Sequence, residues 1–96
     1  MNTFNNSIRR VLITGGCGFI GGTLIRKLLQ DKNLKIFNID KLGYASDSTS
    51  INGLINTYPE MSQRYKLLNV NLTDSQATNK AIKFSNPDIV FHLAAE

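Results

Sequence analysis

Residues 9–29 read RRVLITGGCGFIGGTLIRKLL, and this stretch decides the fold of the 96-residue chain. The apolar run from Val11 to Ile13 predicts a short buried strand, and the glycine-dense residues 14–21 predict a tight turn. From Phe19 onward, apolar residues recur at helical spacing, which predicts an amphipathic helix. Two glycine patterns overlap in the turn: G-x-G-x-x-G at Gly16, Gly18 and Gly21, and G-x-x-G-x-x-G at Gly15, Gly18 and Gly21.

This strand, turn and helix are typical of a dinucleotide site. Bare glycine backbone lets a pyrophosphate approach closely, and the helix start offers unpaired N–H groups and a positive dipole end. Gly21 lets the helix pack tightly on the strand. Asp40 ends the next predicted strand at close to the roughly 20-residue spacing expected of a ribose-binding acid. We therefore expect the site to bind NAD in preference to NADP, because the Asp40 carboxylate would repel a 2′-phosphate. The alternatives are that the glycine turn is purely structural and that Asp40 is a solvated acid at a strand end.

Composition limits the class of protein. With 42% hydrophobic and 19% charged residues, the sequence predicts one small globular domain. The net charge is +4, but the basic residues are scattered, so we expect no nucleic-acid partner. The apolar runs are too short to span a membrane, and residues 1–7 lack signal-peptide features, which favours a cytoplasmic protein. The single cysteine, Cys17, excludes an internal disulfide and a cysteine-based zinc site, and we expect no metal.

The rest of the chain alternates between strand and helix patterns. Residues 1–8 are expected to be a flexible tail and 40–52 a loop. We expect strands at about 10–14, 34–39, 65–70 and 89–93, and helices at about 19–30, 51–57 and 75–84. This order predicts an α/β fold with a doubly wound parallel sheet of Rossmann type, strand order 3-2-1-4 and a ligand at the carboxyl ends of the strands.

Finer expectations concern the last helix and strand. Thr73 or Asp74 is the expected N-cap of the helix at 75–84. The continuous apolar run at 89–93 predicts a strand covered on both faces, interrupted only by His92. His92 is expected to be a core or strand-end residue rather than a catalytic or metal-binding one, and Cys17 a small filler rather than a reactive thiol. The inner face of the helix is expected to carry Ala77, Ala81, Ile82 and Phe84.

Four segments together resemble the extended short-chain dehydrogenase/reductase superfamily, in its NAD-dependent epimerase/dehydratase family, and within it most closely the dTDP-glucose 4,6-dehydratases. They are VLITGGCGFIGGTLIRKLL, IDKLGYAS, NVNLTD and PDIVFHLAAE. The resemblance covers residues 9–96 but only the first third or so of a typical member. It implies that Phe19 and Ile20 contact the pyrophosphate of NAD through their backbone. It further implies that Asp40, Lys41, Leu42 and Gly43 surround the ribose, that Asn71 and Leu72 meet the adenine, that Leu93, Ala94 and Ala95 line the nicotinamide, and that Glu96 lies nearest the sugar substrate.

Four positions depart from the family pattern. Cys17 stands where the family usually has Ala, Gly22 where it has Ser, and Gly43 where it has Thr. Asn71 replaces the Asp that takes the adenine amino group. Because an amide oxygen can accept the same hydrogen bond, we expect weakened rather than lost adenine recognition.

The resemblance also predicts what the chain does. It implies oxidation of dTDP-glucose at C4 by NAD, elimination of water, and hydride return to C6, in a protein that is a homodimer at full length. The catalytic Tyr-x-x-x-Lys and Thr-Asp-Glu residues of the family are absent from these 96 residues, so we assign no catalytic residue. Residues 1–96 are expected to be a partial NAD-binding domain, inactive alone, without the substrate-binding domain and with an aggregation-prone edge at 89–93. The alternatives are another nucleotide-sugar epimerase or dehydratase, a non-catalytic NAD-binding module, and half of a split enzyme.

Overall fold

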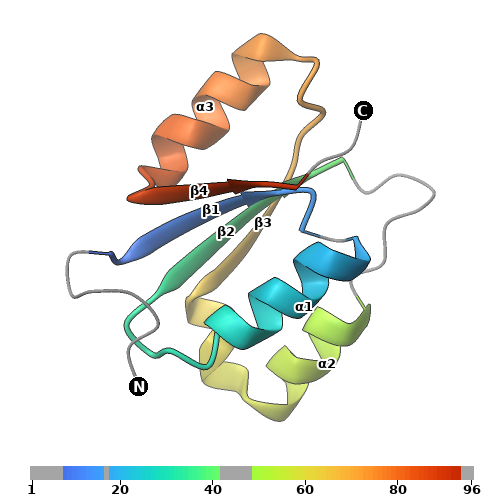
Figure 1. Ribbon diagram of the computed structural model, residues 1–96, viewed down its shortest axis with the longest axis vertical. Helices are drawn as coiled ribbons and strands as arrows, with labels where there is room; N and C mark the ends of the chain where they lie inside the picture. The colour runs from blue at the N-terminus through green and yellow to red at the C-terminus, as the bar shows by residue number, and fades with distance from the viewer. Residues whose placement is uncertain (1–7, 17, 42–48, 94–96) are drawn as a thin grey trace.

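The computed structural model describes residues 8–16, 18–41 and 49–93 (Figure 1). The elements follow in the order β1 (Arg10–Thr14), α1 (Phe19–Leu28), β2 (Lys35–Asp40), α2 (Thr49–Thr57), the 3₁₀ helix η1 (Pro59–Gln63), β3 (Tyr65–Asn69), α3 (Ser75–Ser85) and β4 (Ile89–His92). The alternation of strand and helix predicted from periodicity is confirmed, and β1 has its predicted bounds. None of the helices in these ranges is long and apolar enough to cross a membrane.

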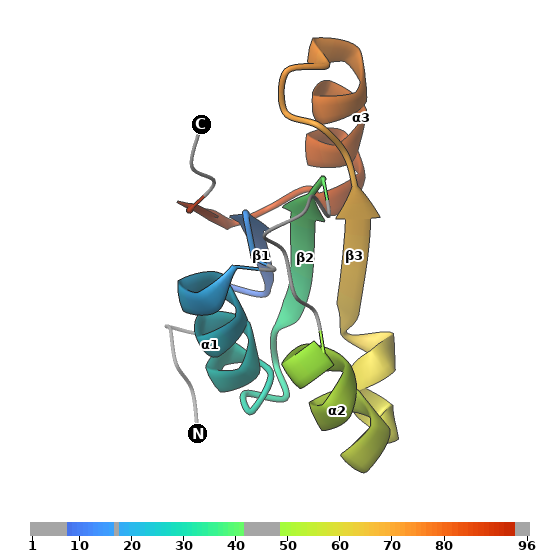
Figure 2. The same ribbon diagram turned by 90° about the vertical axis from the view of Figure 1, so that its right-hand side faces the viewer.

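The four strands form one parallel sheet in the order β3-β2-β1-β4, as predicted. Helices α1 and α2 cover one face of the sheet, and α3 lies on the other (Figures 1 and 2). Right-handed crossovers explain this placement. The chain moves outward from β1 through β2 to β3, then crosses back to β4 beyond β1, so the last crossover helix falls on the opposite face. This reversal is the switch point of a Rossmann fold.

Alternating side chains divide the core between the two faces of the sheet. On the α1 face, Val11, Ile13 and Ile36 are fully buried against α1, whose Ile25 and Leu28 face the sheet. On the α3 face, a smaller buried cluster consists of Leu12, Phe37, Ile39 and Ala81.

Arg64 closes the edge of the fold at which α1 ends. Its guanidinium donates to the backbone carbonyls of Leu29, Asp31 and Leu34, at 2.7, 3.0 and 3.2 Å. It also bonds both carboxylate oxygens of Glu60, four residues earlier, at 3.1 and 2.9 Å. The side chain of Arg64 is only 10% exposed, so η1 and the turn after α1 are held together by one buried cation.

Several predicted boundaries are shifted by one or two residues. Helix α1 ends at Leu28 instead of Gln30, because the N–H of Gln30 bonds the carbonyl of Lys27 in a tighter turn. Strand β2 runs one residue later than predicted and ends at Asp40, which pairs with Asn69. Helix α2 begins at Thr49, before the predicted start, and the helix η1 after it was not predicted.

One packing expectation holds only in part, and another was wrong. Ile82 lines a groove between α3 and the sheet, and the Phe84 ring lies edge-on to the Phe37 ring with centroids 5.9 Å apart, so both are on the sheet side of α3 as expected. They are nevertheless 40% and 56% exposed, whereas Ala81 and Ser85 are buried. Strand β4 is not covered on both faces, because Val90 is 51% exposed. In the described ranges, only the α1 face of β4 is packed, through half-buried Phe91.

Candidate dinucleotide-binding site

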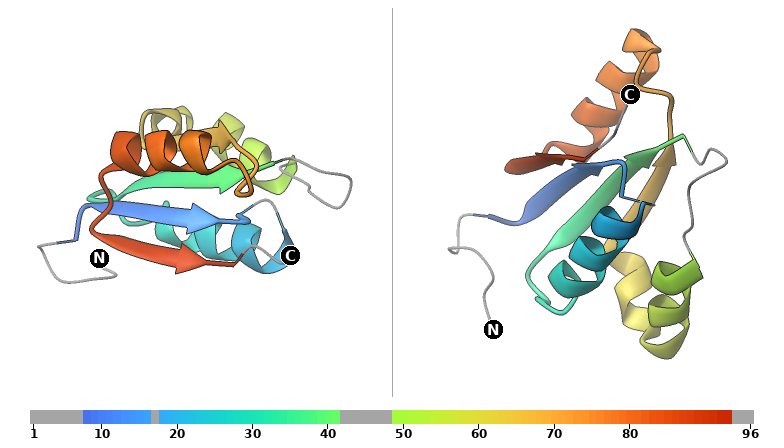
Figure 3. Two further views of the ribbon diagram at one scale, coloured as in Figure 1. Left: turned by 90° about the horizontal axis from the view of Figure 1, so that it is seen from above. Right: turned by 45° about the vertical axis from the view of Figure 1, so that its right-hand side comes forward.

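The four strands end together at one edge of the sheet, and backbone hydrogen bonds continue past each strand end. The N–H of Gly15 donates to the carbonyl of Ile39 at 2.8 Å, and the N–H of Leu93 donates to Thr14 at 2.9 Å. On the other side, the N–H of Val70 donates to the carbonyl of Asp40 at 3.2 Å. The described residues Gly15, Asp40 and Leu93 are therefore brought to a common edge, the one at which the strand arrows end (Figure 3).

The glycines of the turn are required for different structural reasons. Gly15 has a φ of 77°, in the left-handed region that glycine adopts without strain. A Cβ on Gly21 would lie 2.6 Å from the Gly15 carbonyl oxygen and 2.6 Å from the Gly16 Cα, so the helix can approach the turn this closely only without a side chain. Among the described residues, a Cβ on Gly18 would meet only the Gly15 oxygen, at 3.5 Å, which is an ordinary contact distance. Close packing thus explains Gly21 but not Gly18.

The N–H groups of the turn divide into those bonded within the protein and those available to an anion. The N–H groups of Gly15, Gly16 and Gly18 donate to Ile39, Asn38 and Gly15 respectively. Those of Phe19 and Ile20 open α1 and have no acceptor within the helix, and Gly18 as N-cap has no side chain to accept from them. Phe19 is 92% exposed and Ile20 71% exposed, so this first turn is open to solvent.

Asp40 lies at the end of β2, beside the turn. It is 8% exposed, which does not fit the alternative of a solvated acid. The next residue, Lys41, is exposed. Because side chains alternate along a strand, Asp40 points to the same sheet face as Asn38 and Ile36, the face that carries α1.

Asn38 contacts the glycine turn of the candidate site, and the sequence analysis missed it. It is fully buried, its Oδ1 accepts the Gly16 N–H at 2.8 Å, and its Nδ2 donates to the Tyr65 hydroxyl at 3.1 Å. The available signal was a polar residue in an otherwise apolar strand, two positions before Asp40.

Asn71 and Leu72 follow β3 but turn in different directions. The Asn71 Oδ1 accepts hydrogen bonds from the N–H and the hydroxyl of Thr73, at 3.0 and 2.9 Å. The side chain of Leu72 is half-buried and packs with the α3-face cluster. Asp74, one of the two expected N-caps, caps α3 by accepting the Ala77 N–H at 3.0 Å.

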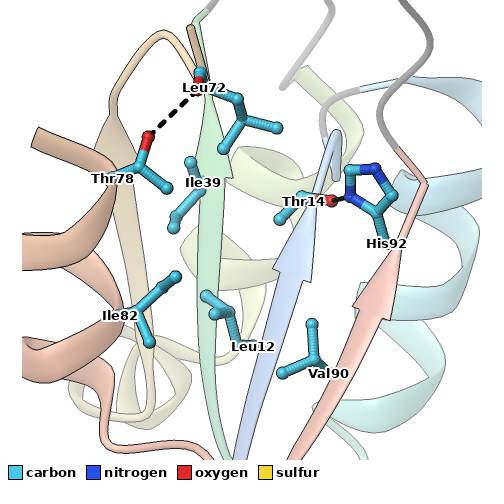
Figure 4. A pocket seen from close by; sticks show the side chains of 8 residues that line it. All are labelled: Leu12, Thr14, Ile39, Leu72, Thr78, Ile82, Val90 and His92. Atoms are coloured by element: carbon cyan, nitrogen blue, oxygen red, sulfur yellow. Dashed lines mark hydrogen bonds between the residues drawn. The ribbon is translucent and has the colours of Figure 1, made fainter. Parts of the chain in front are cut away.

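An apolar groove of about 310 Å³ lies between α3 and the sheet, on the face opposite α1 (Figure 4). Val90 and Ile82 line it, which accounts for their exposure. At its upper end the Nδ1 of His92 lies 2.5 Å from the Thr14 hydroxyl. His92 is thus an exposed strand-end residue, one of the two placements predicted for it.

Some predicted site residues lie outside the described residues: Leu42, Gly43, Ala94, Ala95 and Glu96. So does Cys17, which was expected to be a small filler. The same holds for most of the predicted tail. Within residues 8–16, 18–41 and 49–93, no three or more His, Cys, Asp or Glu residues gather as a metal site would require.

The sequence model of the GDP-mannose 4,6 dehydratase family matches residues 12–96. The chain belongs to this family. It is 40% identical over 91% of its length to a probable dTDP-glucose 4,6-dehydratase of Sinorhizobium fredii, and 36% identical over 91% to the dTDP-glucose 4,6-dehydratase of Escherichia coli. It spans 23% of the length of each of these relatives.

Two solved structures share this family fold and were determined with NAD. One is the dTDP-glucose 4,6-dehydratase of Bacillus anthracis, with a TM-score of 0.77 and 27% identity over 92% of this chain and 27% of that one. The other is the UDP-glucose 4-epimerase of Thermus thermophilus, with a TM-score of 0.69 and 28% identity over 91% of this chain and 24% of that one.

Proposed function

We propose that this chain is the NAD-binding part of a dTDP-glucose 4,6-dehydratase and that residues 1–96 form the first part of its Rossmann domain. The observation that carries the proposal is the meeting of the glycine turn, the open first turn of α1 and the buried Asp40 at one edge of the sheet. The solved dehydratase of Bacillus anthracis, which has this fold, is a complex with NAD. The similarity to two dTDP-glucose 4,6-dehydratases supports the choice of substrate.

The residues present fit a dinucleotide. Among the described residues, a Cβ added at Gly18 would meet no side chain within 4 Å. The N–H groups of Phe19 and Ile20 lie at the helix start, where a pyrophosphate gains from both hydrogen bonds and the helix dipole. In this proposal Asp40 accepts hydrogen bonds from both ribose hydroxyls. Its burial makes those charge-assisted bonds stronger than they would be in water.

The remaining roles rest on the described residues at the strand ends and on the order of the neighbouring residues in the chain. Leu93 continues β4 beside Thr14, next to the glycine turn, where the nicotinamide half would lie. Asn71 and Leu72 follow β3, on the adenine side of Asp40. We propose ribose contacts for Lys41, Leu42 and Gly43, nicotinamide contacts for Leu93, Ala94 and Ala95, and a substrate contact for Glu96.

NAD, when bound, supplies the hydride acceptor and donor for oxidation at sugar C4 and reduction at C6. The part of this chain is to bind the dinucleotide and orient it. None of Tyr44, Tyr58 and Tyr65 has a lysine four residues later. We therefore propose that these 96 residues alone bind NAD without turning over a sugar nucleotide.

Titration with NAD and NADP tests the binding claim. We expect the protein to bind NAD more tightly than NADP. Asp40→Ala should raise the Kd for NAD by at least about 10- to 100-fold, the worth of one of the two charge-assisted hydrogen bonds that would be lost. Glu60→Gln removes the same charge at the opposite end of the sheet and should leave the Kd unchanged. If wild type, Asp40→Ala and Glu60→Gln all bound NAD and NADP with equal affinity, the proposed NAD site at Asp40 would be rejected.

The substrate claim is tested with the whole protein as expressed from its gene. Incubation with dTDP-glucose and NAD should give a sugar nucleotide lighter by one water, detected by mass spectrometry. The likeness to the UDP-glucose 4-epimerase structure favours epimerisation as the second candidate. UDP-glucose converted without change of mass would select that candidate.

A further inference from the structure

Asn38 is a polar side chain in the buried middle of the sheet. Its neighbours along β2 are apolar on both sides, and it is 0% exposed. Burying an amide is unfavourable unless its donors and acceptors are bonded, so the contacts of Asn38 are what stabilise it in this place. Those contacts reach the glycine turn on one side and β3 on the other.

Asn38 lies directly beneath Gly16. Its Oδ1 accepts the Gly16 N–H at 2.8 Å across 22 residues of sequence. A Cβ added to Gly16 would overlap the Asn38 side chain and would lie 2.5 Å from the Ile25 Cδ1. The Asn38 Nδ2 donates to the Tyr65 hydroxyl on β3 at 3.1 Å, which fixes the plane of the amide.

A glycine-rich turn has many conformations available, and a ligand that orders it loses affinity in doing so. The Asn38 bond removes that freedom at Gly16 during folding. It also turns the Gly16 N–H into the sheet, which leaves the N–H groups of Phe19 and Ile20 as the donors that face an anion.

We infer that Asn38 is a positioning residue for the cofactor. Its hydrogen bond to the Gly16 N–H fixes the glycine turn in the conformation that binds the pyrophosphate, although Asn38 itself does not contact the pyrophosphate. The inference rests on the proposed NAD site. It means that part of the affinity for NAD depends on Asn38 in β2 and not on the glycines of the turn alone.

The test compares Asn38→Leu, which keeps the size but loses the acceptor, with Ile25→Val, which trims the other side chain beneath Gly16 and keeps the bond. We expect Asn38→Leu to raise the Kd for NAD about tenfold, the worth of one hydrogen bond, and Ile25→Val to leave it within about twofold. Binding of adenosine, which has no pyrophosphate, should be the same in both variants. An unchanged Kd in Asn38→Leu, or equal losses for NAD and adenosine, would overturn the inference.

Exchange of the Gly16 amide hydrogen in the protein without NAD gives a second readout. We expect slow exchange in wild type, slow exchange in Asn38→Asp, which retains an acceptor oxygen, and fast exchange in Asn38→Leu. Should the leucine variant not fold, fast exchange in Asn38→Asp or in wild type would overturn the inference. A wild-type protein that fails to bind NAD would reject the proposed function instead, while the exchange rates still report on Asn38.

Discussion

Substituting alanine for glycine at two helical positions should change stability in opposite directions. Gly21 and Gly53 both lie in helices, α1 and α2, so each substitution adds one methyl group and the same gain in helix propensity, up to about 1 kcal/mol. At Gly53, apart from the adjacent residues and the backbone of α2 itself, no atom of the described residues lies within 4 Å of the new Cβ. Gly53→Ala should therefore stabilise the fold by about 0.5–1 kcal/mol.

At Gly21 the new Cβ would lie 2.6 Å from the Gly15 carbonyl oxygen and 2.6 Å from the Gly16 Cα. Both are backbone atoms of the turn, which is held to the sheet by the Gly15–Ile39 bond and cannot move aside cheaply. Overpacking of this kind costs about 1–3 kcal/mol, and since the propensity gain is common to both, the two alanine variants should differ by about the same 1–3 kcal/mol.

Urea unfolding followed by far-UV circular dichroism measures this difference. Since the methyl group and the helix propensity are common to both variants, the difference isolates the crowding at Gly21. A Gly21→Ala variant as stable as Gly53→Ala would show that the turn can yield, and the argument that close approach requires glycine here would be wrong.

Three further predictions concern polar groups. Arg64→Met should lower the free energy of unfolding, measured by urea titration, by about 2–4 kcal/mol, because three backbone carbonyls lose a charged donor. Glu60→Gln changes an exposed carboxylate and should have little effect. The backbone N–H groups of Arg9 and Arg10 donate to the Asp88 carboxylate and lower its pKa. The ionised Asp88 therefore stabilises the fold at pH values above the pKa that it has in the unfolded chain, and this stabilisation is lost as the pH falls through its folded pKa. Asp88→Asn should reduce the fall in Tm below about pH 4. Asn71→Asp should tighten NAD binding about fivefold by calorimetry, because a charged acceptor is stronger than a neutral one, and an unaltered Kd would argue against adenine contact.

Local patterns predicted the order of strands and helices because each element carries its own periodicity. Strand β1 has an apolar run between Arg10 and Thr14, and its bounds were predicted correctly. The return of β4 to the side of β1 was predicted from the glycine turn, because the Rossmann fold typical of that turn has the strand order 3-2-1-4. Right-handed crossovers then determine the face on which each helix lies. Boundaries were less certain: Leu29 continues the apolar helical pattern, yet it caps α1, because the turn that follows is held by Arg64, 35 residues later.

Burial of the last strand could not be predicted from its own residues. The run IVFH is apolar at its first three positions, and such a run predicts cover on both faces. Whether Val90 is covered depends on what packs above it, and α3 presents the small Ala81 to the sheet and leaves a groove beside Ile82. The apolar pattern of a strand records which faces are suited to burial, while the packed neighbours determine which faces are buried.

The two polar residues of β2 show how one strand can supply two kinds of site residue. Because side chains alternate, Asn38 and Asp40 share the face that meets the glycine turn, and Phe37 and Ile39 share the other. Asp40 stands at the strand end, where a ligand can reach it, and matches a known spacing from the turn. Asn38 lies two residues before Asp40 in the buried part of the strand, where its Oδ1 bonds the Gly16 N–H of the turn. A slip of one residue in the register of β2 would put both polar groups into the apolar α3 face, so the pairing of Thr14 with Ile39 that forms the core also sets the candidate site.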